Sequence, residues 1–167
     1  MENKAQQLTT VNAQDGPSLS VVGDTYRILI SGEETGGAYT VIDMLIPPHG
    51  GPGPHAHPTY QEAFYIMEGE IEVRTESGRY TAAKGSFVNI PLGGMVHQFK
   101  NETQIIAHML CIITPAGMEK MFGELGKPVS AGVFLPAPDL GPDLIKKFQQ
   151  IAEKFGQQLY PPDYLDK

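Results

Sequence analysis

Three histidines and one glutamate have side-chain types and a spacing that suit a metal ion. His55 and His57 are separated by one residue, so in an extended segment both imidazoles point to the same face. Glu62 follows five residues after His57, at the start of an apolar run. An unpaired carboxylate is costly to bury in such a run. A divalent metal shared with the two imidazoles would offset that cost.

His97 supplies a fourth donor from a distant part of the chain. It follows the turn residues Pro91 and Gly94 and precedes Phe99, in a segment with strand character. Three neutral imidazoles and one carboxylate suit Fe, Mn, Ni, Co, Cu or Zn, so we expect one divalent transition metal. Four protein ligands leave one or two coordination positions for water or substrate, which is typical of a catalytic site.

Short strands punctuated by glycine and proline must position these donors. The loop 47–58, with the sequence PPHGGPGPHAHP, precedes Glu62 and contains His55 and His57. The patterns predict a hairpin of strands 21–30 and 38–46, the second buried on both faces. Further strands are expected at 60–67, 70–74, from 79 onward, 85–90, 96–99 and 104–113. The fold class that follows is all-β, an antiparallel sandwich or barrel.

The chain changes character after the last expected strand. Residues 116–125 predict a helix that ends at Gly126, and a second helix begins near Pro142 with one apolar face. We expect this second helix to cap the barrel or a partner subunit. The predicted organisation is one domain, with an N-terminal arm at 1–20, a barrel at 21–114 and a helical extension packed on it at 115–167.

Composition and charge exclude several classes of protein. Glycine and proline account for 19 and 14 of the 167 residues, which favours many turns over a helical bundle. The formal net charge is −7, and there is no extended basic run, so we expect neither a nucleic-acid partner nor a membrane partner. The single cysteine, Cys111, lies in an apolar run and cannot form an intrachain disulfide. The first residues lack an apolar signal segment, and we expect a cytoplasmic protein.

Two stretches of the sequence resemble the two motifs of the cupin family. The first runs from Gly50 to Gly69 and contains His55-x-His57, four residues, Glu62 and six further residues. The second contains Gly85, Pro91, Gly94-x-x-His97 and Asn101. The sequence departs from the family pattern at two turns. His49 stands where the family has a glycine, and the second motif carries one extra residue between Pro91 and His97.

The resemblance implies a cupin-type antiparallel jelly-roll barrel that holds one metal at His55, His57, Glu62 and His97. The stretch HAHPTYQEAFYIMEGEIEV is also similar to single-domain bacterial cupins of the quercetin 2,3-dioxygenase type. We therefore expect a dioxygenase that acts on a flavonol-like or other enolisable small molecule, with Glu62 as the catalytic proton acceptor. The family also implies a homodimer.

Other functions are compatible with the same residues. A metal-dependent isomerase or lyase acting on a small carbonyl or sugar compound would use the same ligands without O2. A cupin that binds a small molecule without catalysis would also keep the metal site. Strand parity places Phe64 on the side of Glu62 and Phe99 on the side of His97, so we expect Phe64, Tyr60 and Phe99 in the substrate pocket.

Overall fold

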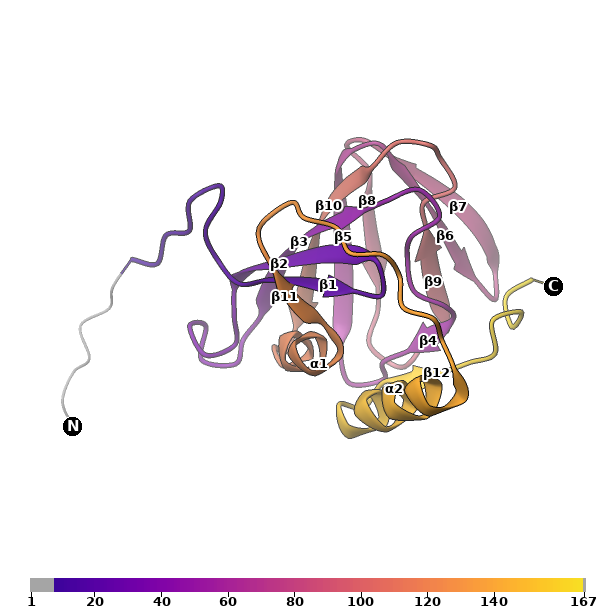
Figure 1. The fold of residues 1–167 in the computed structure, drawn as a ribbon. Coiled ribbons are helices and arrows are strands. Elements are labelled where there is room, and N and C mark those ends of the chain that lie inside the picture. Colours follow the sequence, from indigo (N-terminus) through magenta and orange to yellow (C-terminus); the bar gives the residue numbers. More distant parts are fainter. Residues whose placement is uncertain (1–7, 167) are drawn as a thin grey trace.

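Two antiparallel sheets form the protein, as the computed structural model of residues 8–166 shows (Figure 1). The larger sheet has the strand order β11-β1-β2-β3-β10-β5-β8 and the smaller has β12-β4-β9-β6-β7. The strands are β1 (Ser18–Val21), β2 (Asp24–Ile30), β3 (Thr40–Ile46), β4 (His55–Ala56), β5 (Gln61–Glu68), β6 (Glu70–Thr75), β7 (Gly78–Ala83), β8 (Phe87–Ile90), β9 (His97–Lys100), β10 (Ala107–Thr114), β11 (Lys127–Val129) and β12 (Gln158–Leu159). This arrangement confirms the expected all-β jelly-roll class.

The core lies between the two sheets, because alternate side chains of each strand point inward. β3 shows this clearly: Ile42, Met44 and Ile46 are fully buried, whereas Val41 and Asp43 are only half-buried. The prediction that this strand is buried on both faces is therefore wrong. The outer face of β3 belongs to an antiparallel sheet, and the side chains on that face are only half-buried.

The predicted strand at 21–30 is also interrupted. Val22 and Gly23 both have positive φ, 52° and 100°, and they form the turn of a hairpin between β1 and β2. The apolar character of Val21 and Val22 hides this turn in the sequence. β1 also pairs with β11, so residues 18–20 contact residues 127–129 in the larger sheet. The exact boundaries of the expected arm and extension stay predictions.

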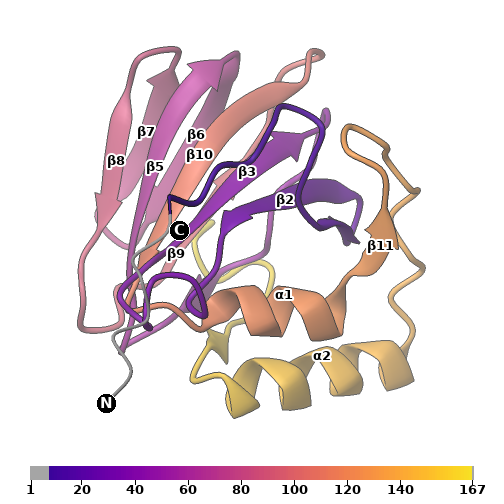
Figure 2. The same ribbon diagram turned by 90° about the vertical axis from the view of Figure 1, so that its left-hand side faces the viewer.

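Two helices lie at one end of the sheets, α1 (Met118–Leu125) and α2 (Pro142–Lys154). Figure 2 shows them side by side at this end. Met118, Met121 and Phe122 of α1 are buried against the sheets. Within the described part of the chain, neither helix has the length and apolar character needed to cross a bilayer.

Candidate metal centre and adjoining cavity

The loop before β4 determines where the first two histidines lie. Gly51 has a φ of 114°, and a Cβ there would lie 2.2 Å from the carbonyl oxygen of Phe99. Only glycine allows the loop to approach β9 this closely. Two backbone bonds, His49 N–H to Asn101 O and Asn101 N–H to Gly50 O, hold the loop beside β9. The chain then enters β4 with His55 facing the interior.

Strand pairing brings two of the four expected donors together, and the residue after β4 adds a third. His55 in β4 lies opposite His97 in β9, so their imidazoles share a face, with ring centroids 4.4 Å apart. His57 follows β4 directly, and its ring centroid is 4.8 Å from that of His97. Glu62 approaches from β5 of the larger sheet, and its Oε2 lies 3.1 Å from His57 Nε2 and 3.4 Å from His97 Nε2.

The four donors fit a single metal ion. One ligand atom from each of His55, His57, Glu62 and His97 lies within 4.8 Å of every other. All four residues are buried, with exposed fractions of 5% or less. Because the donors are two strand neighbours, a loop residue and a carboxylate from the facing sheet, the cluster lies between the two sheets.

The backbone orients each imidazole. The Nδ1 atoms of His55, His57 and His97 lie 2.9, 3.0 and 2.9 Å from the carbonyl oxygens of Gly53, Tyr60 and Met95. A carbonyl oxygen only accepts hydrogen bonds, so each Nδ1 is the protonated nitrogen and donates. In the neutral ring, Nε2 then presents its lone pair to the centre of the cluster, which is the arrangement of metal-binding histidines.

The ionisation states favour the same interpretation. Burial, together with the nearby imidazole of His97, lowers the pKa of His55 to about 3, so this ring is neutral. Burial alone would raise the pKa of Glu62, but the contacts of its Oε2 with Nε2 of His57 and His97 outweigh burial and keep that pKa below its usual value. Burial would lower the pKa of His57, but Glu62 raises it, so without a metal Nε2 of this ring can carry a proton toward the carboxylate; a bound metal would replace that proton. No lysine or arginine among residues 8–166 pairs with Glu62. A metal cation would neutralise this buried carboxylate.

Cys111 is the remaining neighbour of the carboxylate. Its thiol, on β10, donates a hydrogen bond to Glu62 Oε1 over 3.2 Å. Burial, with the Glu62 carboxylate close by, raises the pKa of this thiol well above its usual value. Cys111 is therefore a buried thiol that orients Oε1 of Glu62.

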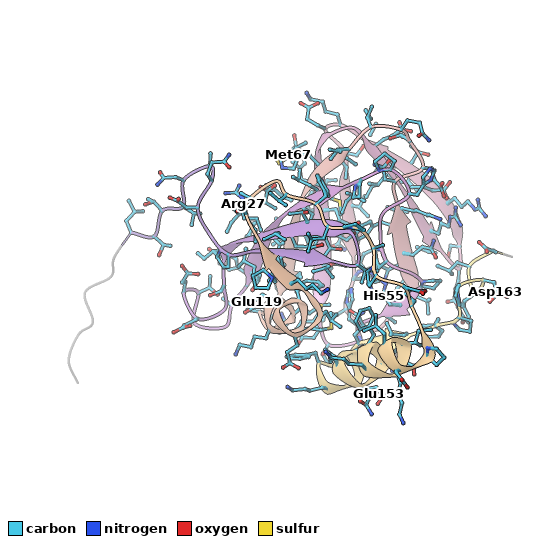
Figure 3. All side chains as sticks on the ribbon, viewed as in Figure 1. Arg27, His55, Met67, Glu119, Glu153 and Asp163 are labelled. Atoms are coloured by element: carbon cyan, nitrogen blue, oxygen red, sulfur yellow. The ribbon has the colours of Figure 1, made fainter. Side chains whose placement is uncertain are left out.

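A cavity of about 330 Å³ adjoins the cluster. Two of the expected donors, His55 and Glu62, line it directly, and apolar side chains of α1 and α2 form much of its wall. Figure 3 shows His55 between the sheets and α2. The apolar wall includes Met118, Met121, Phe122, Leu125, Phe148 and Ala152. This volume is near the lower end of the roughly 300–1,000 Å³ typical of small-molecule sites.

The three aromatic residues expected in the substrate pocket are not part of the wall of this cavity. Phe64 and Phe99 are buried and pack edge to face in the core, with centroids 5.2 Å apart. Tyr60 is half-buried, and its ring packs against the edge of His57. None of the three lines the cavity. Parity predicted which side they face, but residues of β2 and the helices occupy the positions that border the cavity.

Sequence reasoning missed two polar residues of the cavity wall, Asp24 and Tyr26 of β2. Both are buried, with exposed fractions of 3% and 4%. The available signal was an acidic residue next to Gly23 at the start of an apolar strand, two positions before a tyrosine. That pattern could not show that β2 borders the metal cluster.

Comparisons with known proteins concern the family and the fold of the chain. Residues 42–113 match the cupin domain family. The chain is 24% identical over 120 residues to quercetin 2,3-dioxygenase from Bacillus subtilis (strain 168). That match covers 72% of this chain but spans only about a third (35%) of the length of the relative.

Solved structures share the fold. A cupin-superfamily sugar phosphate isomerase from Silicibacter pomeroyi superposes with a TM-score of 0.53 at 20% identity, over 64% of this chain and 75% of that one. Ectoine synthase from P. lautus superposes with a TM-score of 0.53 at 22% identity, over 75% of this chain and 85% of that one. At these identities the likeness concerns the fold alone, since one fold hosts many functions.

Proposed function

The protein is a member of the cupin superfamily through its residues 42–113, and on that premise we propose that it is a metal-dependent dioxygenase. Its substrate would be a flavonol-like or other enolisable small molecule. The observation that carries the proposal is the buried set of three imidazoles and one carboxylate, which borders a largely apolar cavity. The 24% identity to a quercetin 2,3-dioxygenase supports the reaction class.

His55, His57, Glu62 and His97 would hold the metal. The donor set suits the transition metals named above, and the three Nδ1–H groups are already engaged by backbone carbonyls. When bound, a divalent ion would supply Lewis-acid chemistry and a place for an anionic substrate oxygen. The four side chains are almost inaccessible to water, and a substrate would approach the metal from the cavity that His55 and Glu62 line.

Glu62 is the proposed catalytic proton acceptor. It is the one carboxylate of the cluster, it is ionised, and it lines the cavity in which a substrate hydroxyl would lie. Cys111 holds one of its oxygens from behind, so the carboxylate keeps a fixed direction. A fixed acceptor within hydrogen-bond reach is the geometric requirement for general base catalysis.

The cavity wall favours a flavonol-like body over a phosphorylated one. No lysine or arginine among residues 8–166 lines the cavity, so a phosphate group would be buried there without a cationic side chain from this part of the protein. Methionine and phenylalanine side chains, in contrast, pack well against flat ring systems. This observation ranks the dioxygenase above an isomerase or lyase for sugar phosphates.

Metal analysis and oxygen uptake test the proposal together. The purified protein should contain close to one transition metal per chain, and His57→Gln should lose it. His49→Asn is the matched control, because His49 is exposed, lies outside the cluster and has a φ of 65° that asparagine tolerates. Samples loaded with Fe, Mn, Ni or Co are then given quercetin under O2.

We expect quercetin-dependent O2 consumption by at least one metal form of wild type and of His49→Asn, but not of His57→Gln. The absence of O2 uptake with every metal would refute the flavonol assignment. Turnover of a carbonyl compound without O2 would identify an isomerase or lyase instead. Tight binding of a small molecule without any turnover would identify a non-catalytic cupin.

A further inference from the structure

The cavity has a second polar feature on β2, apart from the metal cluster. Resting on the function proposed above, we propose that Asp24, oriented by Tyr26, accepts a hydrogen bond from a substrate hydroxyl other than the one at the cluster. Asp24, Tyr26, His55 and Glu62 all line the same cavity. The substrate class is then narrowed to ring compounds with an apolar body and two separate oxygen functions.

Asp24 is a buried acid that has no ionic partner. Its exposed fraction is 3%, and none of the ion pairs among residues 8–166 includes it. Burying an unpaired carboxyl group reduces stability, so such a group is rare unless it has a task. The apolar residues Met118, Met121 and Phe122 border the same cavity and strengthen any hydrogen bond made inside it.

Two donors fix the direction of the carboxyl group. The Tyr26 hydroxyl donates to Oδ2 over 3.1 Å, and the Gly51 N–H donates to Oδ1 over 3.2 Å. The Tyr26 ring is itself held by the edge of Phe122, with centroids 5.1 Å apart at an interplanar angle of 80°. A carboxylate has about four acceptor positions, and these bonds use two, so acceptor capacity is left for a ligand.

The environment also raises the pKa of Asp24 to about 7, mainly because burial disfavours the charged form. The hydrogen bonds from Tyr26 and Gly51 only partly oppose this effect. Near neutral pH the group can therefore accept a hydrogen bond or a proton from a hydroxyl. A carboxyl group with a raised pKa in a cavity is characteristic of functional sites.

A purely structural carboxylate in this protein has the opposite character. Glu119 is also buried and accepts hydrogen bonds from the backbone N–H groups of Gly32 and Gly117, over 3.0 and 2.7 Å. Those bonds outweigh the effect of burial and lower its pKa. Glu119 does not line the cavity. Asp24 accepts longer hydrogen bonds than Glu119 does, and it borders the cavity. Its hydrogen bond from the Gly51 N–H therefore does not fully explain why a carboxyl group is buried at this position.

The test compares two ligands on the cobalt-loaded protein without O2. Quercetin carries several hydroxyl groups, whereas 3-hydroxyflavone has the same ring system and only the hydroxyl expected at the metal. Calorimetry gives both affinities, and the visible spectrum of Co²⁺ shows whether a ligand reaches the metal. The proteins are wild type, Asp24→Asn, Tyr26→Phe and the control Glu119→Gln. Asparagine keeps the shape and can still accept the Gly51 N–H.

Asp24→Asn should bind quercetin about tenfold more weakly than wild type does, the loss expected for one good hydrogen bond. Its affinity for 3-hydroxyflavone should be unchanged. The ratio of the affinity for quercetin to that for 3-hydroxyflavone should therefore fall in Asp24→Asn. It should fall by a smaller factor in Tyr26→Phe and keep the wild-type value in Glu119→Gln. A purely structural role would weaken both ligands equally and would not move this ratio.

The outcomes separate the two proposals. If quercetin perturbs the Co²⁺ spectrum but Asp24→Asn leaves the affinity ratio unchanged, the hydroxyl site is refuted and the flavonol assignment stands. If neither ligand binds wild type or perturbs its Co²⁺ spectrum, the flavonol assignment and the hydroxyl site both fall. A reduced ratio in Asp24→Asn, with an unchanged one in Glu119→Gln, supports both.

Discussion

Replacing Asp24 by asparagine should stabilise the protein above pH 7 while weakening ligand binding. In the folded state the pKa of Asp24 is about 7, against a usual value of 3.8, because its carboxyl group is buried. Between these two pH values the folded protein binds more protons than the unfolded chain does. Stability from this group is therefore greatest below pH 3.8 and falls as the pH rises toward 7.

The size of the effect follows from the same two values. They differ by roughly three pKa units, each equivalent to about 1.4 kcal/mol, so the ionised carboxylate costs at most about 4 kcal/mol at and above pH 7. Asparagine carries no charge and keeps the carbonyl acceptor for Gly51. We therefore expect similar stabilities of the two proteins near pH 4 and a growing advantage of Asp24→Asn up to pH 7, constant above it.

Urea unfolding of both proteins from pH 4 to pH 9, with a chelator present, measures this difference. The chelator removes metal linkage, and the comparison cancels the titration of all other groups. If Asp24→Asn is less stable than wild type at pH 8, with a difference that does not depend on pH, the reasoning is wrong. Asp24 would then be an ionised structural residue that serves mainly to hold the Gly51 loop.

Three further predictions concern the cluster and the elements that hold it. Glu62→Gln should weaken metal binding by more than the 10- to 100-fold typical of outer-shell changes, measured by competition with a chelator; an unchanged affinity would exclude Glu62 as a ligand. Gly51→Ala should cost several kcal/mol, because its Cβ would lie 2.2 Å from the Phe99 carbonyl oxygen at a φ of 114°. Gly53→Ala, with nothing within 4 Å, is the control and should cost less than about 1 kcal/mol in the same urea titration. Cys111 should resist alkylation in the folded protein and react only in urea, because it is fully buried and burial raises the pKa of its thiol; rapid modification of the native protein, seen by mass spectrometry, would contradict its placement.

Regular strands were predictable because their residues alternate over several positions. β5, β6 and β10 have six or more residues, so inward and outward side chains repeat, and Gly69 and Gly78 mark the ends of β5 and β6. β4, β11 and β12 have two or three residues each, too few for any period to show. They exist because neighbouring strands offer hydrogen-bond partners, as β9 does for β4.

The grouping of the four metal-ligand candidates followed from local features and motif spacing. The one-residue gap between His55 and His57 places both on one side of an extended segment, and Glu62 opens the next strand. The distance of His97 from them along the chain says nothing by itself about contact. The spacing of the two cupin motifs is what associated His97 with the other three candidates. In the structure, the antiparallel pairing of β4 with β9 brings His97 next to His55.

The sequence alone determined the all-β class, the helix after the barrel and the chemistry of the candidate metal site, because these depend on local periodicity and on side-chain type. Only the tertiary structure decided what borders that site. Asp24 and Tyr26 come from a strand far from the histidines in sequence, and the helices close the cavity from the other end of the chain. Such contacts arise from sheet pairing and packing between distant segments, for which no single stretch of sequence carries a pattern.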